Sequence, residues 1–497
     1  MTTNKKKSTM KDGQESNGKV ILTMEQAIEF LKTSQPTFYR WLREGKLKGM
    51  KVGRQWRFYK EDIEAFMRGD SPNVEIPPEI NNLQENLLMR IREFNNDYNY
   101  DENADPLKVV FDMMVYLGYK MRASDIHLEV FKDEVILRYR IDGVLHKIGD
   151  SIPKSLLPFL VDQWKSEAKC NVQKSELSQD GKITIEVEGK KLIIFVHIQP
   201  TVFGESVIAR FIDEVKMTFS LDTLLIDDEN LKIIKKSLDK PYGLFLCTGP
   251  TGSGKTTTLY SALNYVNKPG RKLLSVEDPV EYYHNFVSQV AIDEGKGITF
   301  PSVIKSFLRC DPDVIMVGEI RNLETAHLCH TAALTGHIVL TQLHTIDSVS
   351  ALTRLVDVGV PPYLVGDAVN LIIAQRLIRR ICTHCAIEAE LTTEQIEEAK
   401  SRVSNGGMDW MSLPKKWVKS VGCPECRQLG YRGRSCIVEL LVMTSEIRSA
   451  LIRGASESEL RAIAIDQGMI TLSAEAIRRA SEGETTMEEA LRISPPE

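Results

Sequence analysis

The pattern of hydrophobic and polar positions divides the chain into segments of different character. Residues 1–19 are polar and contain a run of lysines, which predicts a disordered basic tail. Apolar residues at helical spacing begin after Thr23, which together with Gln26 has the sequence of a capping box. A second helix, a strand hairpin over residues 46–59 and a short third helix are expected to follow. Residues 20–69 therefore predict one small module of helices and a hairpin.

The rest of the chain predicts a linker and two larger domains. Residues 70–104 contain prolines and many polar residues and are expected to form a linker with one helix. A long helix from Pro106 to about Tyr119, followed by strands over residues 135–140, 183–187, 192–198 and 207–211, predicts an α+β domain over residues 105–215. Over residues 216–497, strands, glycine-rich turns and helices repeat, and this order indicates an α/β fold with a parallel sheet.

Composition sets limits on function. A length of 497 residues corresponds to about three domains. The formal net charge of −5 argues against a polycation that coats nucleic acid or anionic lipid, although a local basic patch remains open. The longest apolar runs, such as residues 244–247 and 314–317, are far shorter than the ~18 residues that a membrane-spanning helix needs. The N-terminus lacks the apolar segment of a signal peptide, so we expect a cytoplasmic protein.

A glycine-rich loop carries the strongest chemical signal. An apolar strand precedes the loop and a helical pattern follows it, which is the context of a phosphate-binding P-loop. Backbone N–H groups of such a loop cradle phosphate oxygens, its lysine reaches the β- and γ-phosphates, and the hydroxyl that follows binds Mg²⁺. The expected nucleotide-binding residues are Gly249, Pro250, Thr251, Gly252, Ser253, Gly254, Lys255, Thr256 and Thr257, with Thr256 as the magnesium ligand.

Carboxylates and histidines downstream of the loop are candidate catalytic residues. Glu277 and Glu319 each follow an apolar strand, where a carboxylate can bind Mg²⁺ or orient the attacking water. His337 and His344 flank a further apolar strand, and a histidine beside the γ-phosphate can sense hydrolysis. The sequence leaves open which of Glu277 and Glu319 is the general base.

Two cysteine pairs predict a metal site. Cys382 and Cys385 form one C-x-x-C pair, and Cys423 and Cys426 form the other. Four thiolates at this spacing provide a tetrahedral zinc site, which would be structural because no coordination position stays open. Reduced free thiols are the alternative, and a disulfide is less favoured in a reducing compartment. His384 is expected to be only a neighbour of the zinc site.

Several segments, in a fixed order, resemble the ATPases of bacterial type II secretion and type IV pilus assembly. The resemblance covers residues 105–493, nearly four fifths of the sequence. It is carried by the P-loop, by the cysteine pairs and by residues 123–129, 138–143, 277–281, 309–321, 335–347, 374–377 and 483–491.

This resemblance implies a fold, an assembly and roles for single residues. It implies a RecA-like P-loop ATPase domain with a tetracysteine zinc insertion at about residues 380–430, preceded by a PAS-like α+β domain. Members of the family bind ATP with Mg²⁺, form homo-hexamers at the cytoplasmic face of the inner membrane and drive an inner-membrane platform protein. On the matching positions, Glu319 would be the Walker B acid, Glu277 and Glu281 would lie in and just after the Asp box, and His337 and His344 would lie in the His box.

The chain departs from the family pattern at three positions, of which Asn322 in place of an aspartate is the mildest change and the other two bear on hydrolysis. Lys182 and Phe195 stand where the family usually has arginines, and the second of these commonly reaches the γ-phosphate across a subunit boundary. Arg210 is retained. An arginine finger accelerates hydrolysis by several powers of ten, and lysine lacks the bidentate fork of arginine. We therefore expect slow hydrolysis or dependence on Arg210 alone.

Residues 22–67 resemble a different family, the excisionase-like and MerR-like winged helix-turn-helix modules. In such modules the second helix enters the major groove and the wing touches the backbone. The residues that would contact DNA are Arg40 and Arg43 on the helix and Arg54 and Arg57 on the wing. Docking of a protein is the alternative, because secretion ATPases usually carry an N-terminal domain that binds a membrane partner.

The sequence as a whole predicts a hexameric, Mg²⁺-dependent ATPase that powers type II secretion or type IV pilus assembly, without choosing between them. The competing hypothesis is a nucleotide-sensing, DNA-binding regulator built on a degenerate secretion ATPase. A DNA translocase with the same P-loop core fits less well, because the tetracysteine insertion and residues 374–377 resemble the secretion motors.

Overall fold

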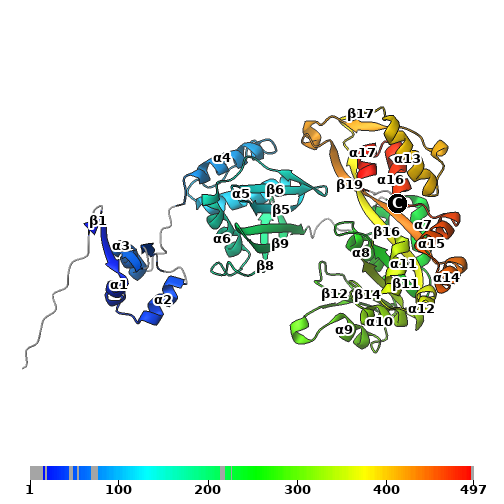
Figure 1. The fold of residues 1–497 in the computed structure, drawn as a ribbon, viewed down its shortest axis with the longest axis horizontal. Helices are drawn as coiled ribbons and strands as arrows, with labels where there is room; N and C mark the ends of the chain where they lie inside the picture. Colours follow the sequence, from blue (N-terminus) through cyan, green and yellow to red (C-terminus); the bar gives the residue numbers. More distant parts are fainter. Residues whose placement is uncertain are drawn as a thin grey trace, which may run out of the picture. The chain divides into compact units, whose positions relative to one another are not determined.

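The structure is a computed structural model, and it describes residues 15–16, 19–43, 47, 49–52, 55–68, 76–212, 219–224 and 226–493. The chain divides into two compact units, residues 1–213 and 214–497 (Figure 1). Most of the expected basic tail, and residues 70–75 of the expected linker, lie outside the described residues. In the described part of the chain, no helix is both long and apolar enough to span a membrane.

The N-terminal module contains the helices and the hairpin that its sequence predicts. Thr23 caps the first helix, and the reciprocal hydrogen bonds between Thr23 and Gln26 form the expected capping box. The rings of Phe38 and Phe58 meet edge to face in the core, with centroids 5.1 Å apart. The sheet order is β1-β2-β4-β3. The elements are β1 (Glu15–Ser16), β2 (Lys19–Thr23), α1 (Met24–Phe30), α2 (Gln35–Arg43), β3 (Met50–Val52), β4 (Gln55–Tyr59) and α3 (Lys60–Arg68).

The following domain is a six-stranded antiparallel sheet with the order β7-β6-β5-β10-β9-β8. Helix α5 packs against β5 and α6 against β10, and Phe111 of α5 meets Trp164 of α6 with ring centroids 4.7 Å apart. The elements are α4 (Glu79–Arg92), α5 (Pro106–Lys120), β5 (Ala123–Val130), β6 (Val135–Ile141), β7 (Val144–Lys147), α6 (Leu157–Glu167), β8 (Gln179–Val187), β9 (Lys190–Thr201) and β10 (Gly204–Ile212). The α+β pattern is present as expected, but β5, β7 and α6 are not among the elements that the sequence predicts, and α4, whose residues the sequence assigns to a linker, packs against α5.

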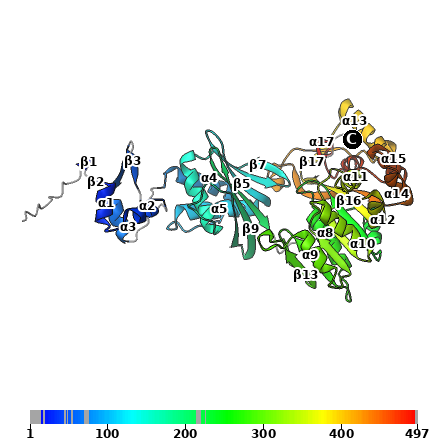
Figure 2. The same cartoon turned by 60° about the horizontal axis from the view of Figure 1, so that its bottom comes forward.

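The second unit is built on a seven-stranded sheet with the order β13-β12-β14-β15-β11-β16-β19 (Figures 1 and 2). Its strands run parallel, as the sequence predicts, except β19, which pairs antiparallel with β16. The strands are β11 (Gly243–Thr248), β12 (Leu273–Glu277), β13 (Val287–Ala291), β14 (Val314–Val317), β15 (Ile338–Leu343), β16 (Val369–Ile381) and β19 (Tyr431–Val442), with a separate pair, β17 (Ala386–Glu388) and β18 (Val418–Ser420).

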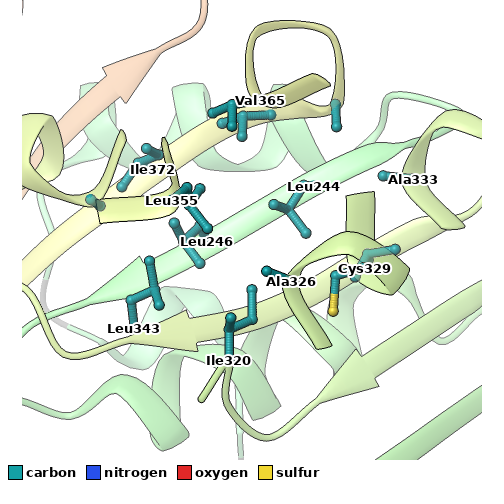
Figure 3. Close-up of a cluster of buried hydrophobic side chains, with 14 of the residues drawn as sticks. Leu244, Leu246, Ile320, Ala326, Cys329, Ala333, Leu343, Leu355, Val365 and Ile372 are labelled. Atoms are coloured by element: carbon teal, nitrogen blue, oxygen red, sulfur yellow. The ribbon is translucent and has the colours of Figure 1, made fainter. Parts of the chain in front are cut away.

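Helices cover both faces of this sheet, and its central strands β11, β14 and β15 are buried along nearly their whole length. Leu244 and Leu246 of β11 lie in one buried cluster, while Phe245 and Cys247 lie in the cluster on the other face. Figure 3 shows the first cluster, where side chains of α10 and α11 meet the strands. The helices are α7 (Asp228–Leu238), α8 (Lys255–Val266), α9 (Phe300–Phe307), α10 (Leu323–Leu334), α11 (Ser348–Asp357), α12 (Pro362–Ala368), α13 (Thr393–Asn405), α14 (Ser445–Ile452), α15 (Glu457–Asp466), α16 (Leu472–Ser481) and α17 (Met487–Ile493).

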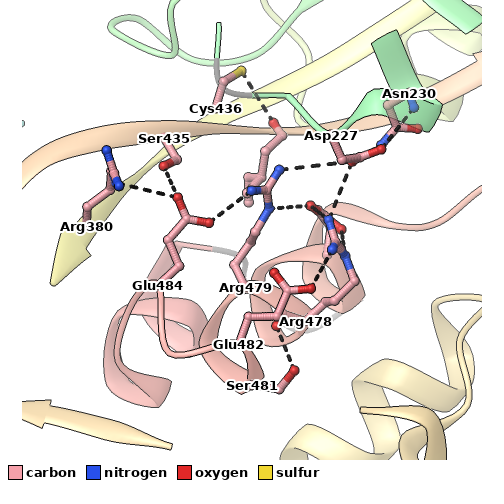
Figure 4. Close-up of polar contacts among 12 residues, drawn as sticks. Asp227, Asn230, Arg380, Ser435, Cys436, Arg478, Arg479, Ser481, Glu482 and Glu484 are labelled. Carbon is pink, nitrogen blue, oxygen red and sulfur yellow. Dashed lines mark hydrogen bonds and ion pairs between the residues drawn. The ribbon is translucent and has the colours of Figure 1, made fainter. Parts of the chain in front are cut away.

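A cluster of buried charges joins α16 to the start of α7 (Figure 4). Glu475, which is 2% exposed, accepts hydrogen bonds from Arg478 and Arg479 at 2.7 Å each. Arg478 also lies 3.4 Å from Asp227, the N-cap residue of α7, and Arg479 donates to Glu484 at 2.9 Å. Partial burial acts to lower the pKa of Arg478 and Arg479, but the neighbouring carboxylates outweigh this effect and raise the pKa of both. These charges are therefore paired inside the fold rather than left solvated.

Candidate active site

The P-loop joins β11 to α8, in the strand–loop–helix context that the sequence predicts. Its glycines have backbone conformations that other residues rarely adopt: φ is +146° at Gly249 and +91° at Gly254. A Cβ on Gly249 would lie 2.6 Å from the backbone oxygen of Gln375, so a side chain has no room there. Lys255, the first residue of α8, is 5% exposed, and its Nζ donates to the carbonyls of Gly249 at 2.8 Å and Pro250 at 3.0 Å. Burial lowers the pKa of Lys255.

Strand β16 supports the loop from the neighbouring position in the sheet. Nε2 of Gln375 donates to the backbone oxygen of Ser253 at 2.7 Å. Arg376 donates to the carbonyl oxygens of Gln375 at 3.0 Å and Ile346 at 2.6 Å. Both side chains are buried, with Gln375 fully enclosed. The sequence marks residues 374–377 only as part of a resemblance, and the structure shows that one of them, Gln375, holds the P-loop backbone at Ser253.

A pocket of about 200 Å³ opens beside the loop, and it collects the expected catalytic side chains of this unit. Its lining includes Thr256, Glu277, Glu281, Glu319 and His344.

Within this pocket, the carboxylate of Glu319 lies between a histidine and an arginine. Oε2 of Glu319 lies 3.1 Å from Nε2 of His344, and Nδ1 of that histidine lies 3.5 Å from Nζ of Lys255. On its other side Glu319 pairs with Arg321, which also lies 3.0 Å from Asp278. The sequence reading gave no role to Arg321 or Asp278.

Glu277 has a different environment, in which its carboxylate is enclosed and accepts several hydrogen bonds. The residue is 4% exposed. Oε1 accepts from Ser275 Oγ at 2.6 Å and from Gln289 Nε2 at 3.0 Å, and Oε2 accepts from the hydroxyl of Tyr260. None of these three donors was among the predicted site residues.

The structure separates the two histidines that the sequence grouped together. His344 follows the carboxyl end of β15, next to the P-loop lysine. His337 precedes the amino end of the same strand, about 20 Å away at the usual rise per residue, and its Nδ1 lies 2.8 Å from the carbonyl oxygen of Ala332. His337 is therefore a local structural residue and not part of this pocket.

Arg210 belongs to the α+β domain, where it occupies one transverse row of side chains. The registers of five strands place Lys182, Phe195, Arg210, Asp125 and Arg140 directly opposite one another in that order. Residues opposite one another in antiparallel strands share a face of the sheet. The Nζ of Lys182 lies 5.6 Å from the centre of the Phe195 ring. Lys182 and Phe195, at the two positions where the resemblance implies arginines, thus lie side by side with Arg210.

The four predicted zinc ligands lie together in the insertion between β16 and β19, residues 382–430, which we call the cysteine module. All four Sγ atoms lie within 4.8 Å of one another, and three of their separations are 3.6–3.8 Å. A tetrahedron with Zn–S bonds of about 2.3 Å has edges of about 3.8 Å, so the donor set fits zinc. Burial acts to raise the pKa of Cys426, but the backbone N–H groups of Cys423 and Gly430 outweigh this effect and lower that pKa to about 7. His384 does not belong to this set of donors.

The predicted DNA-contact residues are only partly described. Arg40 and Arg43 lie on α2, and Arg57 lies on β4, where it donates to Trp56 O at 3.1 Å and Gln55 Oε1 at 2.7 Å. Arg54 lies outside the described residues.

The fold and the P-loop define the second unit as a P-loop ATPase domain. The family model for the type II/IV secretion system protein matches residues 101–492, and that for a helix-turn-helix domain matches residues 21–71. The chain therefore belongs to the type II/IV secretion system protein family, is an ATPase, and carries an N-terminal helix-turn-helix.

Named relatives support this assignment. The type II secretion system protein HxcR of Pseudomonas aeruginosa is 41% identical over 79% of this chain and 78% of its own length. The type II secretion system protein E of Xanthomonas campestris is 39% identical over 78% of this chain and 67% of its own length. The type IV pilus assembly ATPase PilB of Myxococcus xanthus is 37% identical over 88% of this chain and 76% of its own length.

A solved structure shares the fold. The Legionella pneumophila ATPase DotB superposes with a TM-score of 0.57 at 19% identity, over 79% of this chain and 96% of its own.

Proposed function

We propose that this ATPase is a hexameric motor that powers type II protein secretion or type IV pilus assembly. The observation that carries the proposal is the P-loop lysine beside the Glu319–His344 pair, in a chain 37–41% identical to named secretion and pilus-assembly proteins. The motor would act in the cytoplasm, at the inner membrane, through a platform protein. In this proposal the second unit is RecA-like and the six-stranded domain is PAS-like.

The chemistry of the site residues supports hydrolysis of ATP. Lys255 would bind the β- and γ-phosphates, and the oxygens of Thr256 and Glu319 are the ligand type that Mg²⁺ prefers. Mg²⁺ would neutralise charge that develops on the phosphates. Both carboxylates remain candidates for the general base: Glu277 is enclosed by three donors, whereas Glu319 is paired with His344 and Arg321.

Arg210 would complete the site from another copy of the chain. Its side chain is 60% exposed, and an arginine that reaches a γ-phosphate across a subunit boundary stabilises the transition state. Because Phe195 has no charge, Arg210 would carry more of this role than in relatives that have an arginine there. The cysteine module would hold zinc with Cys382, Cys385, Cys423 and Cys426, as a structural element.

The helix-turn-helix supports two proposals for the role of the N-terminal module. In the first, the module contacts DNA through Arg40 and Arg43 on a helix and Arg54 and Arg57 on a wing. Docking onto a membrane-bound partner is the other. The named relatives are secretion and pilus-assembly proteins, so a DNA-binding regulator with a degenerate motor domain is the less favoured overall function.

Steady-state ATP hydrolysis by the full-length protein with Mg²⁺, measured against protein concentration, tests the proposal. Wild type is compared with Lys255→Ala, and with Lys296→Ala as a control, because Lys296 is an exposed lysine paired with Asp293. We expect specific activity to rise with protein concentration, to be lost in Lys255→Ala and to be unchanged in Lys296→Ala. Turnover that is absent in wild type at every concentration, even with the platform protein added, would contradict the motor.

A further inference from the structure

The hydroxyl of Tyr260 is a fixed donor to the Glu277 carboxylate. Tyr260 is 1% exposed, and it donates to Oε2, while Ser275 and Gln289 donate to Oε1. Burial, and then the charge of Glu277, raise the pKa of Tyr260, so the phenol keeps its proton and acts as a donor. Tyr260 stands on α8, five residues after the P-loop lysine. One helix therefore carries both a phosphate-binding lysine and the residue that orients a candidate catalytic carboxylate.

The ring of Tyr260 lies in a cluster of aromatic side chains. Its centroid lies 4.6 Å from that of His284, 5.8 Å from Tyr282 and 5.1 Å from Phe219. Phe219 also meets Tyr282 at 5.1 Å and His284 at 5.2 Å, so the four rings touch in nearly every combination. Burial lowers the pKa of His284, which favours a neutral imidazole among these rings. Because these rings pack closely against one another, displacing one ring would displace its neighbours.

Hydrogen bonds attach the backbone of Phe219 to the same helix. Asn264 of α8 donates through Nδ2 to the carbonyl oxygen of Phe219 at 3.0 Å, and its Oδ1 lies 3.2 Å from Nδ1 of His284. Phe219 lies near the start of the ATPase unit, which begins at residue 214. Phe219 thus contacts Tyr260 through its ring and accepts a hydrogen bond from α8 through its backbone.

We propose that Tyr260 is a positioning residue, which orients the Glu277 carboxylate for ATP hydrolysis and makes that orientation depend on the placement of Phe219. The proposal rests on the function proposed above. Rotation of Phe219 would move the ring of Tyr260, and the hydroxyl would then lose its alignment with Oε2. Misplacement of a catalytic group by about 1 Å can lower a rate by about 100-fold.

The first experiment compares Tyr260→Phe with Tyr265→Phe in the full chain. Tyr265 lies on the same helix, and its hydroxyl donates to Asp239 at 3.0 Å, so the control removes the same chemical group at a more exposed position. We expect kcat for ATP to fall by about 10- to 100-fold in Tyr260→Phe, with KM and the affinity for a fluorescent ATP analogue within about twofold of wild type. Tyr265→Phe should match wild type.

Gln289→Ala, which removes a donor to the other oxygen, is the second variant if Tyr260→Phe does not fold. It should show the same loss of kcat with KM unchanged.

The second experiment tests the link to Phe219. Phe219→Leu should lower kcat in the wild-type background but have no further effect in Tyr260→Phe, because the hydroxyl that it displaces is already missing. Phe286→Leu, at a residue that is 90% exposed, serves as the control and should not change kcat.

Equal kcat in wild type and Tyr260→Phe, or additive effects of the Phe219 and Tyr260 substitutions, would overturn this inference while leaving the motor intact. If instead wild type and Tyr265→Phe do not hydrolyse ATP at all, the proposed function itself fails.

Discussion

Asp125 and Arg210 lie opposite each other on adjacent antiparallel strands, and Nε of the arginine donates to Oδ1 of the carboxylate at 2.9 Å. The side chain of Asp125 is only 6% exposed, whereas that of Arg210 is 60% exposed. On the other flank, Arg140 lies 3.7 Å from Oδ2 of the same carboxylate. One buried carboxylate therefore contacts the Nε atoms of two arginines on one face of the sheet, an exposed one and a half-buried one.

This relationship predicts that Asp125→Asn slows ATP turnover, although the substitution does not alter any P-loop residue. The neutral amide no longer holds the two guanidinium groups by charge, so their alignment is lost. We expect turnover to fall by about tenfold, and Arg210→Ala to cost about 1,000-fold if Arg210 acts as an arginine finger. The measurement is specific activity at a protein concentration where wild type has reached its plateau.

The matched control is Glu129→Gln, because Glu129 pairs with Arg138 on the same sheet. An equal loss in both variants would mean that any broken ion pair on this sheet lowers activity, and Asp125 would then have no special role.

The cysteine module predicts one bound zinc ion per chain. Cys385→Ser removes a ligand and should lower the zinc content, measured by elemental mass spectrometry, and lower the Tm by at least about 5 °C. His384→Ala and Cys170→Ser should keep the metal, because neither residue belongs to the set of four thiols. Zinc content that is unchanged in Cys385→Ser, or absent from wild type prepared without chelators, would contradict the site.

The buried charge cluster predicts that neutralising each of two glutamates paired with the same arginine changes the thermal stability by very different amounts. Glu475 and Glu482 both lie 2.7 Å from Arg478, but their side chains are 2% and 37% exposed. Removing one charge of a buried pair costs about 3–5 kcal/mol, because the partner is left uncompensated, whereas an exposed pair contributes about 0–1 kcal/mol. Calorimetry should show a Tm loss of about 10 °C for Glu475→Gln and about 2 °C or less for Glu482→Gln. Similar losses would refute this distinction.

Stability should decrease as the pH falls below about 6.5, the ordinary histidine pKa. Burial lowers the pKa of His330, which is fully enclosed on α10, and lowers those of His127 and His284 as well. Because the unfolded chain binds a proton at a higher pH than the folded chain, stability is complete above the unfolded pKa and is lost below it.

Thermal unfolding at pH 7.5 and 5.5 measures this loss of stability. The pH dependence should be clearly smaller in His330→Gln than in wild type, and only slightly changed in His327→Gln, an exposed histidine on the same helix whose charge is the smallest cause acting on the pKa of His330. A pH dependence that is the same in all three proteins would show that His330 does not contribute.

The sequence predicted those features that depend on local patterns. The P-loop context, the capping box at Thr23, the strand ends that carry Glu277 and Glu319, and the pairing of four cysteines all follow from residues close together in the chain. The sequence does not predict strand β5 because polar residues such as Asp125 and Glu129 occupy alternate positions along it, where their cross-strand partners stabilise them. A single strand read alone does not show those partners.

The sequence also does not predict the residues that hold the P-loop and the Glu277 carboxylate in place, because their contacts join distant parts of the chain. Gln375 holds the backbone of Ser253, which lies 122 residues earlier, and Gln289 reaches Glu277 across the parallel pair of β13 and β12. Such contacts depend on strand order and register. Neither can be read from the spacing of polar and apolar positions.

The two strands that bracket the cysteine module meet at its base, because Ile381 of β16 and Tyr431 of β19 are partners in the antiparallel ladder. The chain therefore leaves the sheet and re-enters it at a single point, which makes residues 382–430 an enlarged hairpin loop in topological terms. An insertion of this kind can be lengthened, exchanged or lost during evolution without rethreading a strand, since closing a longer loop costs little. The sheet that carries the P-loop can thus stay constant while this loop changes in length and sequence.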